Sequence, residues 1–197
     1  PIKRSYDLAD AVVVQSQFNR DLVVRYFGDH DNIHVIHNDT CLDLINSIPA
    51  ANLGVAKENV WMCASSWRPH KRLSENIRYF QKHATDDAVL LVAGKDAEVW
   101  APDLTDDRIK LVGDLQWEQM ISLMKASGHF LHLALLDHCP NVVVDARACG
   151  CRVICASSGA TKEIAGENAV VVQDIEWDML PFELYKPTAL DFRNVSR

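Results

Sequence analysis

The sequence predicts an α/β fold in which helices cover both faces of a doubly wound, mainly parallel sheet. Short runs rich in valine and isoleucine recur along the chain, and the stretches between them carry apolar residues at helical spacing. That alternation is expected of parallel strand–helix–strand units. The chain has 197 residues, the length of one ordinary domain.

The elements follow one another with short connections. From its first residues the chain leads directly into a strand-like run at 11–16, followed by a helix that ends at Gly28 and a second strand at 33–38. Residues 47–59 have the composition of a loop. Strands of the main sheet are predicted at 61–65, 88–94, 109–114, 129–135, 152–157 and 168–173, with helices at 73–84, 117–124 and near 161–166. The tail from 176 is predicted to be irregular.

Ligands of such a sheet bind outside the carboxyl ends of its strands. The turns that follow the predicted strands should therefore surround one cleft. These turns come after Ser65, Gly94, Gly113, Leu136 and Ser157.

Composition argues against several classes of main partner. Hydrophobic residues make up 48% of the chain and charged residues 24%, as in globular proteins. A formal charge of −7 argues against nucleic acid and against an anionic membrane surface. No apolar run reaches the ~18 residues of a spanning helix, and no signal-like segment opens the chain, which predicts a cytoplasmic location.

Neither the cysteines nor the acidic turn predicts a metal site. The six cysteines fit no common zinc spacing, so buried, reduced thiols are expected. Asp29-His30-Asp31 follows the end of a predicted helix and is interpreted as a polar turn.

The segment DHCPNVVVDARACG, residues 137–150, is the most informative. Its valines favour a strand, but the proline, the alanines and Gly150 favour a helix from about Pro140 to Cys149. Asp137 then precedes the helix and Asp145 lies about 7 Å along it. A helix N-terminus binds phosphate, and carboxylates on either side accept hydrogen bonds from hydroxyls. A phosphate between two hydroxylated rings describes a nucleotide sugar.

These residues resemble the C-terminal, donor-binding half of retaining glycosyltransferases of the GT-B fold, the family 4 or glycosyl transferases group 1 type. The family carries two acidic residues separated by seven, here Asp137 and Asp145, then the sequence ARACG, a strand, and a turn that here contains Gly159 and Glu163. The segments ADAVVVQSQFNRDLV, IHVIHNDTCLD and LVGDLQWEQMISLMKASGHFLHLAL are also similar to family segments. The resemblance covers nearly the whole chain.

The resemblance implies one Rossmann-like lobe of a GT-B enzyme and a single nucleotide-sugar-binding domain over residues 1–197. Residues 1–50 would enter from an acceptor-binding lobe, 57–175 would form the core, and 176–197 would be a tail. The acceptor lobe would belong to the same or another chain, and any membrane association would run through it. The isolated fragment would be inactive.

The resemblance also assigns site residues. Arg68 and Lys71 would bind the donor diphosphate, with Arg72 as a possible substitute because the family's basic pair is usually spaced differently. Asp137 would contact the donor sugar near the reacting centre and Asp145 the ribose hydroxyls. Backbone groups around Val112 to Leu115, Gly113 included, would meet the base, and because Pro140 lacks an N–H, Asn141 and Val142 would supply amides to the phosphate.

The implied reaction transfers a hexosyl group with retention from a UDP- or GDP-sugar, without a required cofactor or metal. Two alternatives remain open: a nucleotide-sugar epimerase of the same fold, and a non-catalytic binding module or subunit of a split transferase. No role is assigned to His138. Trp67 is equally consistent with the core and with the ligand. The remaining histidines of the strand-like runs are interpreted as packing or edge residues: His34, His37, His129 and His132.

Overall fold

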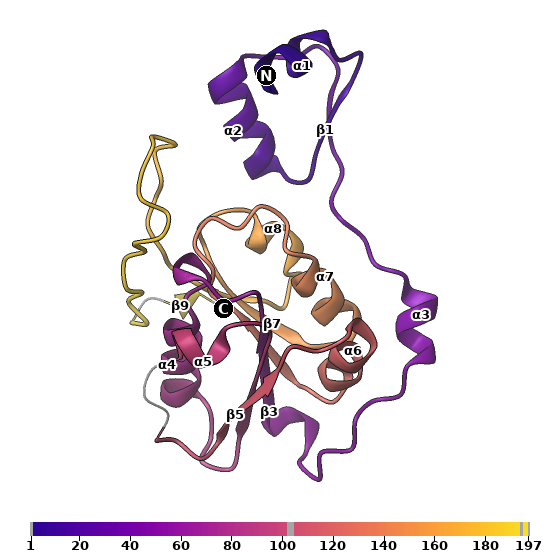
Figure 1. The fold of residues 1–197 in the computed structure, drawn as a ribbon, viewed down its shortest axis with the longest axis vertical. Coiled ribbons are helices and arrows are strands. Elements are labelled where there is room, and N and C mark those ends of the chain that lie inside the picture. The colour runs from indigo at the N-terminus through magenta and orange to yellow at the C-terminus, as the bar shows by residue number, and fades with distance from the viewer. Residues whose placement is uncertain (1, 102–104, 194, 197) are drawn as a thin grey trace.

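A seven-stranded sheet forms the centre of the molecule, with strand order β5-β4-β3-β6-β7-β8-β9 (Figure 1). The computed structural model describes residues 2–101, 105–193 and 195–196. Every neighbouring pair is parallel except β8 with β9, so the predicted fold class is confirmed. The strands are β3 (Val60–Ala64), β4 (Val89–Ala93), β5 (Ile109–Gly113), β6 (His129–His132), β7 (Arg152–Ala156), β8 (Val170–Val172) and β9 (Val195–Ser196).

Apolar clusters cover both faces of this sheet. On one face pack α4 (Leu73–His83), α5 (Ala97–Trp100) and part of the tail; on the other pack α6 (Trp117–Lys125), α7 (Asn141–Ala148) and α8 (Thr161–Ile164). Strands covered on both faces are apolar throughout rather than alternating. All five residues of β3 are accordingly buried, which is why the strand runs could be recognised from the sequence.

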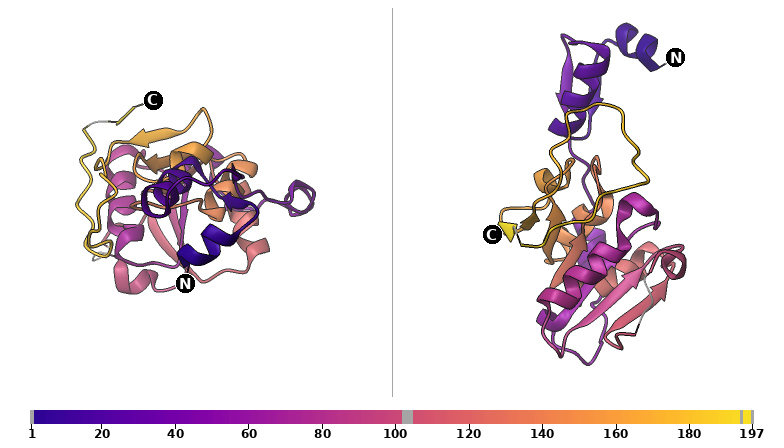
Figure 2. Two further views of the ribbon diagram at one scale, coloured as in Figure 1. Left: turned by 90° about the horizontal axis from the view of Figure 1, so that it is seen from above. Right: turned by 90° about the vertical axis from the view of Figure 1, so that its left-hand side faces the viewer.

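The N-terminal residues form a small separate unit beside the core (Figure 2). Strands β1 (Val12–Val14) and β2 (Ile33–Val35) make a two-stranded parallel sheet, joined by α2 (Gln17–Phe27). Gly28 ends α2 as predicted, at a φ of 96° that favours glycine.

The first helix, α1 (Ile2–Leu8), overturns one expectation. The chain does not lead directly into a strand, because residues 2–8 are helical. Tyr6 buries its ring beside Phe27 and His30, and its hydroxyl donates to the Gly28 carbonyl at 2.7 Å. Contacts with residues more than twenty positions away thus stabilise a helix that has little periodicity of its own.

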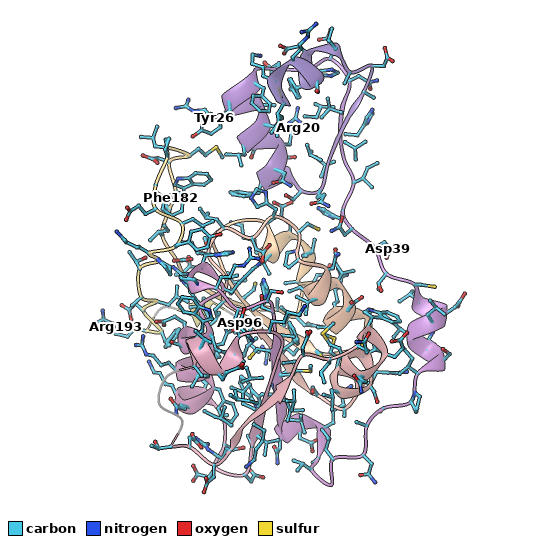
Figure 3. All side chains as sticks on the ribbon, viewed as in Figure 1. Arg20, Tyr26, Asp39, Asp96, Phe182 and Arg193 are labelled. Carbon is cyan, nitrogen blue, oxygen red and sulfur yellow. The ribbon has the colours of Figure 1, made fainter. Side chains whose placement is uncertain are left out.

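A second unpredicted helix, α3 (Leu42–Ser47), lies in the long connection from β2 to β3 (Figure 1). Asp39, labelled in Figure 3, marks the segment leading into it. Ile45 of α3 is buried against the core, and Lys125 donates to the carbonyls of Ile45 and Ile48. The loop predicted at 47–59 is confirmed between the end of α3 at Ser47 and a short 3-10 turn at Lys57–Asn59.

The tail contacts both units. It is irregular over residues 176–193, as predicted, but Val195–Ser196 form β9 because they pair with β8. Figure 3 shows Tyr26 of α2 beside this tail, and the Tyr26 hydroxyl donates to the Met179 carbonyl. In the part of the chain that the structure describes, no helix is long and apolar enough to cross a bilayer.

Candidate functional site

A cleft of 340 Å³ opens at the carboxyl ends of the central strands. It lies where the strand order reverses, because β3 continues to β4 and β5 on one side and pairs with β6 on the other. Such a switch point is where doubly wound sheets bind ligands. The cleft is lined by Ala64, Ser65, Ser66, Lys71, Ala93, Gly94, Asp114, Leu115, Met120, His132, Asp137, Pro140, Asn141 and Val142.

Most of the predicted turns therefore meet here. The turns after β3, β4, β5 and β6 all line the cleft, whereas the turn after β7 does not. Gly94 allows the turns after β3 and β4 to touch: its φ is 109°, and a Cβ there would lie 1.8 Å from the Ser65 carbonyl oxygen. Substitution of this glycine would push the two loops apart.

Three charged or polar side chains converge on the inner wall of the cleft. The Asp137 Oδ2 atom accepts from Lys71 Nζ at 2.5 Å and lies 2.9 Å from His132 Nε2. Lys71 follows the strand β3 on a 3-10 turn, Pro69–Lys71, whereas His132 is the last residue of β6. The structure brings Lys71 and Asp137 together, as expected for a shared site. The sequence predicts a packing or edge role for His132 and does not predict its contact with Asp137.

This arrangement holds Asp137 as a carboxylate. Burial raises the pKa of Asp137, but the hydrogen bonds and charges of His132 and Lys71 outweigh it and hold the pKa well below its usual range. The backbone is fixed as well, since a Cβ on Gly159 would lie 2.6 Å from the Asp137 carbonyl oxygen and the Ala160 N–H donates to the same oxygen. Asp137 is a hydrogen-bond acceptor here and is unsuited to donate a proton.

Helix α7 starts at the cleft, within one residue of the predicted position. Pro140 is its N-cap, and the N–H groups of Val143 and Val144 donate to the Pro140 carbonyl. The amides of Asn141 and Val142 belong to the first turn, which has no partners within a helix, and both residues line the cleft. An anion in the cleft would meet these N–H groups and the positive end of the helix dipole.

The other two basic residues lie away from the cleft. Arg68 is exposed and lines a neighbouring cavity beside Arg72 and Trp100. Arg72 adopts a left-handed conformation with a φ of 54°, and its buried guanidinium pairs with Asp174 at 2.6 and 3.1 Å. The short 3-10 turn separates the three side chains, so Arg72 does not replace Lys71 in the cleft.

Asp145 is also placed differently from expectation. Its side chain is buried, its Oδ2 atom accepts from Trp117 Nε1 at 3.0 Å, and it does not line the cleft. Asn141, four residues earlier, is exposed at the rim, where its Oδ1 atom accepts from Asn38 Nδ2. The two side chains predicted to share a helix face therefore differ in burial.

Half of the segment expected to meet a base, residues 112–115, lines the cleft. Asp114 and Leu115 line the cleft, whereas Val112 and Gly113 do not, and the Gly113 carbonyl already accepts from the Gly94 N–H. Trp67 is a core residue: it is buried, and its indole N–H donates to the Ala93 carbonyl.

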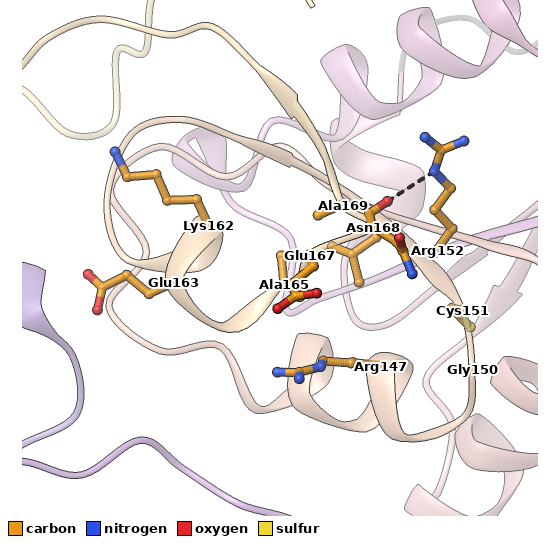
Figure 4. Close-up of a pocket in the computed structure, with 12 residues that line it drawn as sticks. Arg147, Gly150, Cys151, Arg152, Lys162, Glu163, Ala165, Glu167, Asn168 and Ala169 are labelled. Atoms are coloured by element: carbon orange, nitrogen blue, oxygen red, sulfur yellow. Dashed lines mark hydrogen bonds between the residues drawn. The ribbon is translucent and has the colours of Figure 1, made fainter. Parts of the chain in front are cut away.

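A larger cavity, of 1240 Å³, lies where β7 and β8 begin (Figure 4). Arg147 and Glu167 bring both signs of charge to it, and Arg152 donates to the Asn168 carbonyl. It lacks the convergence of turns from several strands that marks the first cleft. Among the described residues, no group of three or more His, Cys, Asp or Glu could hold a metal ion.

Several solved structures are similar to this chain. Sucrose-phosphate synthase from Thermosynechococcus elongatus is 19% identical, with a TM-score of 0.70 over 87% of this chain and 47% of its own. HepE from Anabaena, solved with UDP and glucose, is 19% identical, with a TM-score of 0.70 over 86% and 51%. Starch synthase IV from Arabidopsis thaliana, bound to ADP and acarbose, is 11% identical, with a TM-score of 0.64 over 88% and 47%.

The chain thus spans about half the length of the structures it resembles. At these identities the likeness establishes the fold. No curated protein matches the sequence. The family described as "Glycosyl transferases group 1" matches residues 46–181, which is more than half of the chain. The protein belongs to the glycosyl transferases group 1 family.

Proposed function

We propose that this chain is the donor-binding half of a retaining, family 4 type glycosyltransferase and corresponds to the C-terminal lobe of a GT-B fold. The observation that carries the proposal is the cleft at the switch point, where Lys71, Asp137 and the start of α7 meet. Residues 57–175 would form the donor domain. Residues 1–50 would connect it to an acceptor lobe, and 176–197 would close over it.

The charges of the cleft fit a nucleoside diphosphate between two hydroxylated rings. Lys71 and the amides of Asn141 and Val142 would bind the diphosphate. Asp137 would accept a hydrogen bond from the donor sugar through Oδ1. Within the predicted segment from Val112 to Leu115, the backbone groups of Asp114 and Leu115 would meet the base.

Two of the predicted contacts need a rearrangement. Arg68 is exposed and does not line the cleft, so its long side chain would have to turn toward the cleft to reach a phosphate. Asp145 would reach the ribose hydroxyls only through the carboxylate oxygen that Trp117 does not contact. We therefore assign Lys71 and Asp137 the larger effects on donor binding.

The chemistry of the site is electrostatic. Transfer breaks the bond between the sugar and the diphosphate, and negative charge grows on the departing nucleoside diphosphate. Groups already arranged around that charge lower the barrier, here Lys71 and the N-terminus of α7. A hexosyl group would be transferred with retention, without a metal. An acceptor lobe in the same or another chain would complete the reaction, which would take place in the cytoplasm.

The donor is tested by calorimetric titration with UDP-glucose, GDP-mannose, ADP-glucose and the free nucleotides. UDP- and ADP-linked sugars are included because solved neighbours hold UDP with glucose and ADP with acarbose. We expect one UDP- or GDP-sugar to bind. Lys71→Met, which removes the ammonium and keeps most of the apolar stem, should weaken that binding about ten-fold or more, because a hydrogen bond to a charged group contributes ~1.5–3 kcal/mol.

Lys110→Met is the matched control, since Lys110 is exposed on β5 and does not line the cleft. The donor site would be refuted if Lys71→Met left the affinity unchanged. It would also be refuted if none of the nucleotides or nucleotide sugars bound. Release of a free epimerised nucleotide sugar without acceptor would identify the epimerase instead. Donor binding with no transfer in the presence of an acceptor lobe would identify a binding subunit.

A further inference from the structure

His132 lies at the base of the cleft, on the carboxyl end of β6. Its side chain is only 4% exposed, and its Nε2 atom is 2.9 Å from Asp137 Oδ2. Because a carboxylate only accepts hydrogen bonds, the Nε2 atom carries the proton in this contact. His132 therefore donates a hydrogen bond to Asp137 from a fixed position in the sheet.

The two donors to Asp137 differ in how freely they can leave it. Lys71 has a side chain that is 22% exposed and belongs to a short 3-10 turn, and its ammonium is the natural partner of an incoming diphosphate. His132 is held in the sheet by pairing of β6 with β3 and β7. When the diphosphate competes for Lys71, the histidine remains.

We propose that His132 is a positioning residue that anchors the Asp137 carboxylate while Lys71 turns to the donor diphosphate. This inference rests on the proposed function, because it assigns the same cleft to a nucleotide sugar. It goes beyond that function by assigning His132 a role that acts through Asp137 and decides whether the sugar is recognised.

The contact with His132 also determines which carboxylate oxygen of Asp137 is available to a ligand. His132 and Lys71 both contact Oδ2, whereas Oδ1 accepts only the His138 backbone N–H among the contacts described, at 2.9 Å. A sugar hydroxyl would therefore bind at Oδ1. Other titratable groups near this carboxylate are His70, the ring of His138, and Cys139.

The test separates sugar recognition from nucleotide binding. In His132→Leu the imidazole donor is lost, and His132→Asn keeps a polar side chain that is too short to donate from the Nε2 position. His132→Gln restores an N–H at about that position. The exposed His83, outside the cleft, supplies the control His83→Leu.

Two measurements are made on each variant. In the ligand-free protein, carbon-13 NMR of the aspartate carboxyls follows the titration of Asp137. Loss of His132 should move that titration to higher pH, and His132→Gln should move it back. By calorimetry, affinity for UDP-glucose should fall about ten-fold or more while affinity for UDP alone changes little.

The outcomes distinguish the two levels of the proposal. If Asp137 titrates in His132→Leu and His132→Asn as it does in the wild type, the anchoring role is overturned, whether or not nucleotides bind. Equal losses of UDP and UDP-glucose affinity would also overturn it, since they indicate a general structural defect. Failure of the wild type to bind any nucleotide sugar, with the Asp137 titration still shifted, would refute the proposed function and leave the anchor in place.

Discussion

Five of the six cysteines are buried, and burial controls their reactivity. Burial raises the pKa of Cys149 to about 11 and that of Cys151 and Cys155 to about 12, and it raises the pKa of Cys63 and Cys139 as well. Cys41 alone among them is exposed. The thiolate is the nucleophile, so a raised pKa leaves almost none of it near neutral pH.

Alkylation should therefore be selective. With iodoacetamide at pH 8, the native protein should gain one adduct, on Cys41, and the other five thiols should react only after unfolding, as read by peptide mass spectrometry. Cys41→Ser should remove the native adduct. Rapid modification of Cys149 or Cys151 in the folded chain would contradict the packing described here.

Helices α6 and α7 are joined by a polar contact inside an apolar layer. Trp117 Nε1 of α6 donates to Asp145 Oδ2 of α7, and the thiol of Cys149, the C-cap of α7, lies within hydrogen-bonding distance of the Ile121 carbonyl. If a buried carboxylate loses its hydrogen-bond donor, the free-energy cost of its desolvation is no longer offset. The Trp117 indole therefore stabilises the fold by its hydrogen bond to Asp145 as well as by the apolar surface that it buries.

Trp117→Phe tests this contact. It keeps an aromatic ring and removes the N–H, and we expect the free energy of unfolding to fall by about 1–3 kcal/mol in urea denaturation. Trp100→Phe, on the exposed side of α5, should change it by no more than about 0.5 kcal/mol. Equal effects of the two substitutions would show that Asp145 does not depend on Trp117.

At the scale of the whole molecule, Glu163 forms hydrogen bonds that connect the N-terminal unit to the core. The two carboxylate oxygens of Glu163 on α8 accept from the backbone N–H groups of Gln17 and Phe18 at 2.8 and 2.9 Å. Those amides open α2, whose N-cap is Ser16. His37 lies 3.5 Å from the same carboxylate. A charge at a helix N-terminus stabilises it, and here the charge comes from the other unit.

Glu163→Ala should loosen this docking without unfolding the core. Hydrogen exchange of the Gln17 and Phe18 amides should accelerate about ten-fold, because two charge-assisted hydrogen bonds are lost. Glu163→Gln, which keeps one acceptor oxygen, should give an intermediate rate. Glu167→Ala, an exposed acid nearby, should leave both amides unchanged; acceleration there would indicate a nonspecific effect.

Local pattern was sufficient to predict the main sheet and most of its helices. The strands β3 and β4 are continuous apolar runs because both faces are covered, and α4 is periodic because one face packs on the core. Pro140 and Gly150 bound α7 despite its three valines, because proline suits a helix start and Gly150 adopts a φ of 79° after the helix. The assembly of turns into one cleft follows from the parallel order of the strands.

The sequence by itself thus determined the fold class, the family resemblance and the placing of Lys71 and Asp137 at the carboxyl edge of the sheet. Only the tertiary structure decided which side chains meet there. Arg68, Lys71 and Arg72 are neighbours in sequence and diverge because a 3-10 turn and a left-handed residue rotate them apart. The contacts of His132 with Asp137 and of Trp117 with Asp145 join separate elements, and such pairings depend on packing that no local pattern records.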